Sequence, residues 1–394
     1  SGMGYITNFQ PTFSFANIGE AFPDHAYLWL RLLPTLAGLL LPIIIWFLAR
    51  ELGLSKTASL VAALFIALDN ALLVQSRFIL LDAFLLLFGF SALLLYFIFR
   101  RTQRIELLAA AGALAALAVS VKWTGATFLF LIIGMEIISY WRRWQGLWLV
   151  NRVLLLFVVP FILYYISFAI HFALLNKTGG GDAFMTPQFR KTLVGSQDAA
   201  NPALKPLSEF EKFIELNKEM YLSNARLTAS HPYSSTWDTW PFMVRTIYYW
   251  NQDNMLETNR IYLIGNPVVW WLAALGIIHA LLQLIAEVPG YLRESMNKRQ
   301  KVIALLVGAY LINLLPFVGI HRAMFLYHYF TALIFAVLAL AMLIESLGEI
   351  HAKRFALGAI ALATVVFLYF APLSYGLPMS ESWFNRHMWF STWR

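Results

Sequence analysis

Residues 78–99 read FILLDAFLLLFGFSALLLYFIF, an apolar run that contains a single charged side chain, Asp82. A run of about 18 or more apolar residues can cross a bilayer as an α-helix, because a helix bonds all of its backbone groups internally. A carboxylate exposed to lipid is costly, so we expect Asp82 to bind a neighbouring helix or to face a wet cavity. This stretch predicts a transmembrane helix that packs against others.

The rest of the chain repeats this pattern. Of its 394 residues, 60% are hydrophobic and only 13% are charged, and the mean hydropathy is +0.66. These values lie well outside the range of soluble domains. We therefore predict an all-α polytopic membrane protein, a multi-span helical bundle with a large outer-face loop. About ten spans are expected, at 27–49, 57–74, 78–99, 105–121, 123–141, 153–175, 262–287, 302–318, 323–345 and 355–374.

Basic residues gather in alternate loops, and this alternation predicts the orientation. Lys and Arg favour the cytoplasmic side of a membrane, which places the cation-poor loops and both termini on the outer face. The net charge of +8 then reflects this bias, and we predict no nucleic-acid partner. The expected divisions are an outer segment 1–26, a six-span region 27–175, an outer loop 176–260, a four-span region 261–375 and an outer tail 376–394.

Four cations stand beside the expected outer ends of spans, on the side that the orientation rule depletes: Arg31, Arg77, Lys122 and Arg322. Long basic side chains at such positions often serve only as interfacial anchors. They could also converge on the anionic headgroup of a lipid. We favour the second hypothesis, provided that the bundle brings the four together.

Five further residues are candidates for a sugar or acceptor site: Asp82, Asp69, His231, Trp237 and His328. Five residues turn a helix by roughly 140°, so Asp82 and Arg77 are poor partners for each other. Asp82 is either a structural acid or part of the site. Trp237 lies in SHPYSSTWDTWPF, residues 230–242, for which an amphipathic segment resting on the membrane is the better interpretation.

No cofactor is predicted with certainty. His321 and His328 are seven residues apart without a carboxylate at ligand spacing, which is a weak signal for metal. The sequence predicts no metal ligands and leaves a divalent metal open as a cofactor.

Several stretches together resemble the protein O-mannosyltransferase family of GT-C glycosyltransferases. The most specific are ALDNALLVQSRFILLDAFLLLF at 67–88, SHPYSSTWDTWPF at 230–242 and RAMFLYHYF at 322–330, and VKWTGATF at 121–128 adds to them. The last four spans look like the family's C-terminal membrane region. The chain looks like a bacterial or archaeal member, because no MIR domain fits within the loop 176–260.

This resemblance implies a reaction and a place for it. Mannose would pass, with inversion, from polyprenyl-phosphate mannose to Ser or Thr hydroxyls of secreted proteins, on the extracytoplasmic face of a prokaryotic cell membrane. Arg31 and Lys122 match family residues expected to hold the lipid phosphate. The resemblance also leaves a dimer open.

One departure concerns the catalytic base. The family carries an Asp-Glu pair in its first outer loop, and no such pair occurs near the start of this chain. We expect either a fragment that lacks the first span and this loop, or a replaced base. Two other functions stay open: a polyprenyl-phosphate-sugar transferase acting on a glycolipid, like aminoarabinose transferases, and, less favoured, an anion or lipid transporter.

Overall fold

The computed structural model describes residues 25, 27–140, 146–253, 257–291, 296–320 and 322–394. The expected segment 1–26 lies outside this part of the chain, apart from His25. The first half of the bundle contains α2 (Tyr27–Glu51), α3 (Lys56–Ala67), α4 (Asn70–Arg77), α5 (Asp82–Thr102), α6 (Ile105–Val121), α7 (Ala126–Tyr140), α8 (Gly146–Val153) and α9 (Val159–Leu174). The second half contains α12 (Pro267–Tyr291), α13 (Lys298–Leu314), α14 (Phe330–Glu345) and α15 (Glu349–Tyr375).

Helical segments occur at all ten expected spans. Seven helices of the described chain are long and apolar enough to cross a membrane, or eight if α3 and α4 are one span bent by 52°. Two further apolar helices, Ile105–Val121 and Trp123–Ser139, are shorter. The helical membrane architecture is therefore confirmed, whereas the count of ten is not.

The break between α3 and α4 is caused by Asp69. Its carboxylate caps α4 by accepting a hydrogen bond from the Leu72 amide at 2.9 Å. An Asp side chain that bonds the first free amides of a helix starts a new helix instead of continuing the old one. Asp69 therefore marks the bend within the span expected at 57–74.

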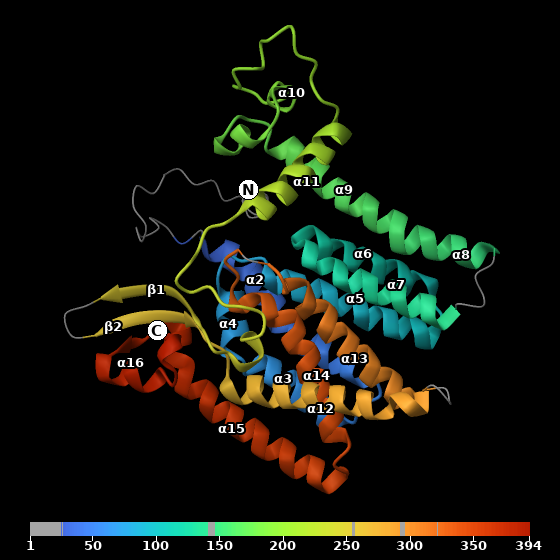
Figure 1. Ribbon diagram of the computed structural model, residues 1–394, viewed down its shortest axis with the longest axis vertical. Helices are drawn as coiled ribbons and strands as arrows, with labels where there is room; N and C mark the ends of the chain where they lie inside the picture. The colour runs from blue at the N-terminus through green and yellow to red at the C-terminus, as the bar shows by residue number, and fades with distance from the viewer. Residues whose placement is uncertain (1–24, 26, 141–145, 254–256, 292–295, 321) are drawn as a thin grey trace.

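Helix α14 forms the centre of the bundle, and 83% of its spanning window is buried. It lies among α12, α13 and α3 in Figure 1. A Cβ on Gly276 of α12 would come within 2.5 Å of the Leu340 Cα, so only glycine permits this close crossing. The apolar composition of α14 thus reflects protein packing more than contact with lipid.

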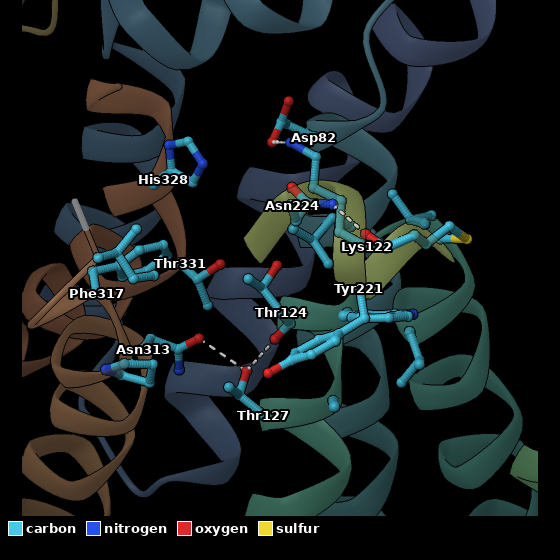
Figure 2. A pocket seen from close by; sticks show the side chains of 18 of the residues that line it. Asp82, Lys122, Thr124, Thr127, Tyr221, Asn224, Asn313, Phe317, His328 and Thr331 are labelled. Carbon is cyan, nitrogen blue, oxygen red and sulfur yellow. Dashed lines mark hydrogen bonds and ion pairs between the residues drawn. The ribbon is translucent and has the colours of Figure 1, made fainter. Parts of the chain in front are cut away.

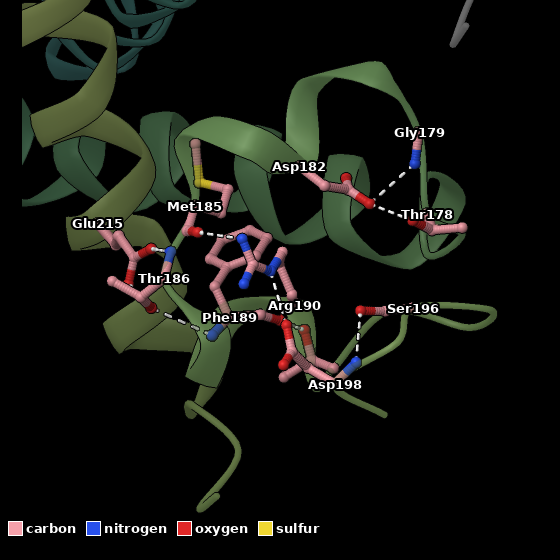
Figure 3. Close-up of polar contacts among 11 residues, drawn as sticks. Thr178, Gly179, Asp182, Met185, Thr186, Phe189, Arg190, Ser196, Asp198 and Glu215 are labelled. Carbon is pink, nitrogen blue, oxygen red and sulfur yellow. Dashed lines mark hydrogen bonds and ion pairs between the residues drawn. The ribbon is translucent and has the colours of Figure 1, made fainter. Parts of the chain in front are cut away.

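The segment between α9 and α12 is folded. It contains α10 (Pro187–Arg190) and α11 (Glu209–Arg226), which lie beside the end of α9 at one end of the bundle (Figure 1). Glu215 on α11 accepts hydrogen bonds from the amide and hydroxyl of Thr186, and Arg190 forms an ion pair with Asp198 at 2.7 Å (Figure 3). These polar contacts hold the loop over a small aromatic core.

A small antiparallel sheet was not expected from the sequence. Strand β1 (Ile247–Asp253) pairs with β2 (Thr258–Leu263), and β2 pairs with the two-residue β3 (Pro378–Met379). The C-terminal tail then forms α16 (Glu381–His387), and Trp393 donates a hydrogen bond to the Met243 carbonyl at 2.7 Å. The tail 376–394 is therefore tied to the end of the loop 176–260 (Figure 1).

Candidate functional site

A cavity of about 1210 Å³ opens between two groups of helices. One wall comes from α5, α6 and α7, the opposite wall from α13 and α14, and the end of α11 borders it (Figure 2). We call this cavity the central pocket. Most of its lining is apolar, and its polar lining residues include Asp82, Ser120, Lys122, Thr124, Thr127, Asn224, Thr228, Asn313, Arg322, His328 and Thr331.

Lys122 projects into the central pocket from the turn between α6 and α7. Its backbone is extended, and the 3₁₀ turn η1 (Trp123–Gly125) follows at once. A Cβ on Gly125 would lie 2.3 Å from the Ala118 carbonyl oxygen, so glycine is required for this tight turn. The Lys122 ammonium lies 2.5 Å from Asp82 Oδ1 and 5.1 Å above the Tyr327 ring.

Asp82 occupies the first turn of α5, where the helix dipole favours a negative charge. Its second oxygen accepts a hydrogen bond from Gln75 Nε2 at 2.7 Å, and the Tyr249 hydroxyl donates to Gln75 Oε1 at 2.6 Å. Burial, together with the Asp82 charge, raises the pKa of Tyr249 well above its ordinary value. The phenol therefore stays protonated at neutral pH and remains the donor.

Arg322 and His328 reach the central pocket from the segment before α14. The His328 ring stacks on Tyr327 at 4.6 Å and on Trp240 at 5.9 Å, and its Nδ1 lies 2.9 Å from the Phe325 carbonyl oxygen. Lys122 and Arg322 line the same pocket as this ring. Residues 200 or more positions apart in the sequence thus line one pocket.

The other two predicted cations lie together in a different place. Arg77 donates a hydrogen bond to the Ser374 carbonyl at 2.7 Å and lies 4.4 Å above the Tyr375 ring of α15. Arg31 is exposed and lies 5.8 Å above the Phe78 ring. Among the described residues that line the central pocket, the predicted four-cation cluster is therefore represented by Lys122 and Arg322 alone.

The remaining predicted site residues lie outside the described lining of the pocket. Asp69 is fully buried, and its Oδ2 accepts hydrogen bonds from Trp270 Nε1 at 2.6 Å and the Asn266 amide at 2.9 Å. His231 is exposed beside Phe325, and Trp237 packs against the main core. Asp69 therefore joins the start of α4 to Asn266 and to Trp270 of α12, and its assignment to a sugar or acceptor site stays a prediction.

Two family models match this chain along most of its length. The model described as "Dolichyl-phosphate-mannose-protein mannosyltransferase" matches residues 1–176, and "C-terminal four TMM region of protein-O-mannosyltransferase" matches residues 209–393. The chain belongs to the protein O-mannosyltransferase family. The resemblance seen in its motifs is thereby confirmed, and this family member is an integral membrane protein.

Individual relatives agree with this assignment. "Dolichyl-phosphate-mannose--protein mannosyltransferase 1" of Saccharomyces cerevisiae is 32% identical over 214 residues, which are 50% of this chain and 25% of that protein. "Protein O-mannosyl-transferase 1" of Mus musculus is 31% identical over 210 residues, 49% of this chain and 28% of that protein. The chain thus spans about a quarter of the length of the curated relatives it matches.

A solved structure shares the fold of this chain. It is the S. cerevisiae "protein O-mannosyltransferase Pmt1-Pmt2 complex bound to the sugar donor". The TM-score is 0.90 at 19% identity, and the match covers 100% of this chain and 84% of that one. The expected GT-C-type bundle is therefore confirmed.

Sequence reasoning did not identify several residues of the family member's pocket. Thr127 donates a hydrogen bond to Asn313 Oδ1 at 2.9 Å, which links α7 to α13 across the pocket wall (Figure 2). Gln75 and Tyr249, which hold Asp82, were also missed. Polar residues at the end of an apolar run could have pointed to Asn313 and Gln75, whereas no local signal marks Tyr249.

Metal ligands are the last feature to consider. Within the described ranges, no group of three or more His, Cys, Asp or Glu residues is arranged to hold a metal ion. The divalent metal left open by the sequence is untested.

Proposed function

We propose that this chain transfers mannose from polyprenyl-phosphate mannose to Ser or Thr hydroxyls of proteins. The observation that carries the proposal is the placement of Lys122 and Arg322 at one large, mostly apolar pocket at the end of the bundle. Family membership and the names of the curated relatives support the same reaction class.

The positive charges of Lys122 and Arg322 suit the negative charge that develops on the leaving phosphate in this reaction. The acceptor oxygen forms a bond to the anomeric carbon while the bond from that carbon to the phosphate oxygen breaks, and polyprenyl phosphate leaves. Cations placed at the departing phosphate stabilise its growing negative charge. Lys122 and Arg322 take this role, and the apolar walls that include Phe130 and Phe168 accommodate the first isoprene units.

A general base must take the proton from the acceptor hydroxyl as it attacks. Asp82 is the one acid among the described residues that line the pocket, and both of its oxygens are engaged by Lys122 and Gln75. We therefore assign Asp82 to the positioning of Lys122 and not to proton transfer, and we assign none of the described residues as the base.

The acceptor would approach from the side of the loop 176–260. We propose that this side is extracytoplasmic, since the opposite loops carry most of the Lys and Arg residues. A prokaryotic cell membrane is the proposed location. His231 and Trp237 are proposed acceptor contacts near the mouth, and Arg31 and Arg77 are proposed to guide the donor headgroup. A dimer is proposed by analogy with the Pmt1-Pmt2 complex.

A transfer assay tests this proposal. The chain in lipid nanodiscs is given radiolabelled polyprenyl-phosphate mannose and a peptide rich in Ser and Thr, with and without EDTA. Transfer to the peptide is the expected result, and loss with EDTA would add a metal. Transfer to a glycolipid instead would change the acceptor class, and transfer to neither would overturn the proposal.

A matched lysine pair connects the activity to the pocket. Lys122→Ala should abolish most transfer, whereas Lys353→Ala should leave it unchanged, because Lys353 lies in an exposed pair with Glu349 on α15. Equal transfer rates in the two variants would show that the activity does not depend on the central pocket.

A further inference from the structure

The described lining of the central pocket carries more positive than negative charge. Lys122 and Arg322 contribute two positive charges, and Asp82 contributes the one negative charge found in its described lining. With histidine counted as neutral, the net charge is +1. An anion that binds Lys122 must also approach Asp82, because the ammonium and Asp82 Oδ1 are only 2.5 Å apart.

The Asp82 carboxylate is held by two contacts. Lys122 binds one oxygen, and Gln75 donates a hydrogen bond to the other. The orientation of the Gln75 amide is set by Tyr249, whose hydroxyl donates to Gln75 Oε1 and leaves the NH₂ group to face Asp82. The side chain of Asp82 is 9% exposed, so it cannot turn away freely when a second anion arrives.

Donor and product of the proposed reaction differ in charge. The phosphodiester donor carries one negative charge, whereas a phosphomonoester carries about −1.5 to −2 at pH 7. We propose that Asp82 is a specificity-determining residue, which repels the extra charge of a polyprenyl phosphomonoester and so shifts the selectivity of the pocket towards the singly charged phosphodiester. This inference rests on the proposed function, because it requires a polyprenyl phosphate ligand.

The expected size of the effect follows from the distances. A phosphate that accepts a hydrogen bond from Lys122 lies roughly 5–6 Å from Asp82, where one unit of charge at an effective dielectric of about 20 changes binding by tenfold or more. Water in the open pocket weakens this interaction, so we expect about a tenfold effect on the ratio of the two affinities. Repulsion of this kind also speeds release of the product.

The experiment compares two lipids that differ in charge and contain no sugar. Binding of polyprenyl phosphate and of polyprenyl methyl phosphate to the chain in nanodiscs is measured at pH 8. The preference is defined as the affinity for the methyl diester divided by the affinity for the phosphomonoester. In Asp82→Asn, this preference should fall by about tenfold relative to the wild type, since the resident negative charge is gone.

Three further variants separate charge from structure. Asp82→Glu keeps the charge and should keep the preference, and Tyr249→Phe removes only a hydrogen bond and should also keep it. Asn224→Asp adds a charge on an exposed side chain of the pocket, so it should increase the preference even if Asp82→Asn does not fold. All three can be measured with the same pair of lipids.

The outcomes separate a failure of this inference from a failure of the proposed function. If both lipids bind and the ratio is the same in wild type, Asp82→Asn and Asn224→Asp, Asp82 only positions Lys122, and the inference is wrong while the proposed function stands. If the wild type binds neither lipid and transfers no mannose, the proposed function and the inference fail together.

Discussion

The bundle contains two buried ion networks, one at each end of the α5–α7 region, and they differ in access to a cavity. At one end, Glu136 is buried and binds Tyr96 at 2.8 Å and Arg152 at 3.1 Å. At the other end, Asp82 is paired with Lys122, whose side chain is 35% exposed and lines the central pocket. Both pairs would look alike in sequence as charges within apolar runs.

This comparison shows when a membrane-embedded ion pair can act on a ligand. The Arg152 side chain is 11% exposed and Glu136 is 4% exposed, and Arg100, which also pairs with Glu136, is 33% exposed. None of these three residues is among the described residues that line the central pocket. Lys122 keeps free donor capacity towards a cavity of about 1210 Å³. Of the two networks, only the Lys122–Asp82 pair lies among the described residues that a ligand in the central pocket can reach.

The largest expected effect comes from removing Glu136. Glu136→Ala leaves Arg152 buried without this carboxylate, and breaking a buried pair costs about 3–5 kcal/mol. We expect a lower unfolding temperature in detergent, with KM for the donor unchanged in the protein that remains folded. An unchanged unfolding temperature would contradict the structural role.

The next largest effect concerns Lys122. Lys122→Met keeps most of the apolar volume but removes the charge at the leaving phosphate, so kcat/KM for transfer should fall by roughly 10²–10³-fold. Thermal unfolding should shift less than in Glu136→Ala, because Lys122 is 35% exposed and Asp82 keeps its hydrogen bond from Gln75. A stability loss as large as that of Glu136→Ala would remove the distinction between the two networks.

A smaller effect is expected at Tyr249. Tyr249→Phe deletes one hydrogen bond to Gln75, which contributes about 1 kcal/mol, so kcat/KM should fall roughly fivefold. Because burial and the Asp82 charge raise the pKa of Tyr249, this phenol stays protonated through neutral and mildly alkaline pH. The ratio of wild-type to mutant activity should therefore be constant from pH 7 to pH 9 in a transfer assay. A ratio that varies with pH would contradict the assignment.

The sequence predicts the bundle well because bilayer crossing leaves a local signal, an apolar run of the right length. It also predicts that Arg77 and Asp82 do not pair, since helix geometry alone separates them. It cannot name the partner of Asp82, because Lys122 lies 40 residues away and only packing brings it close. The sheet is hidden for the same reason, as β2 pairs with β3 more than 100 residues later.

The division of the four predicted cations also depends on packing. Each of the four stands at the expected outer end of a span, and the sequence does not show which spans are neighbours in the bundle. The structure places Arg77 against α15 and Lys122 against α5. Arg31 and Arg77 therefore offer a second location for a lipid phosphate. An experiment must distinguish this location from the central pocket.

The most direct test of the account is an experimental structure of the chain with bound polyprenyl phosphate. The account predicts phosphate density in the central pocket, within hydrogen-bond distance of the Lys122 ammonium. Density beside Arg31 and Arg77 instead, with Lys122 still bound to Asp82 alone, would contradict it.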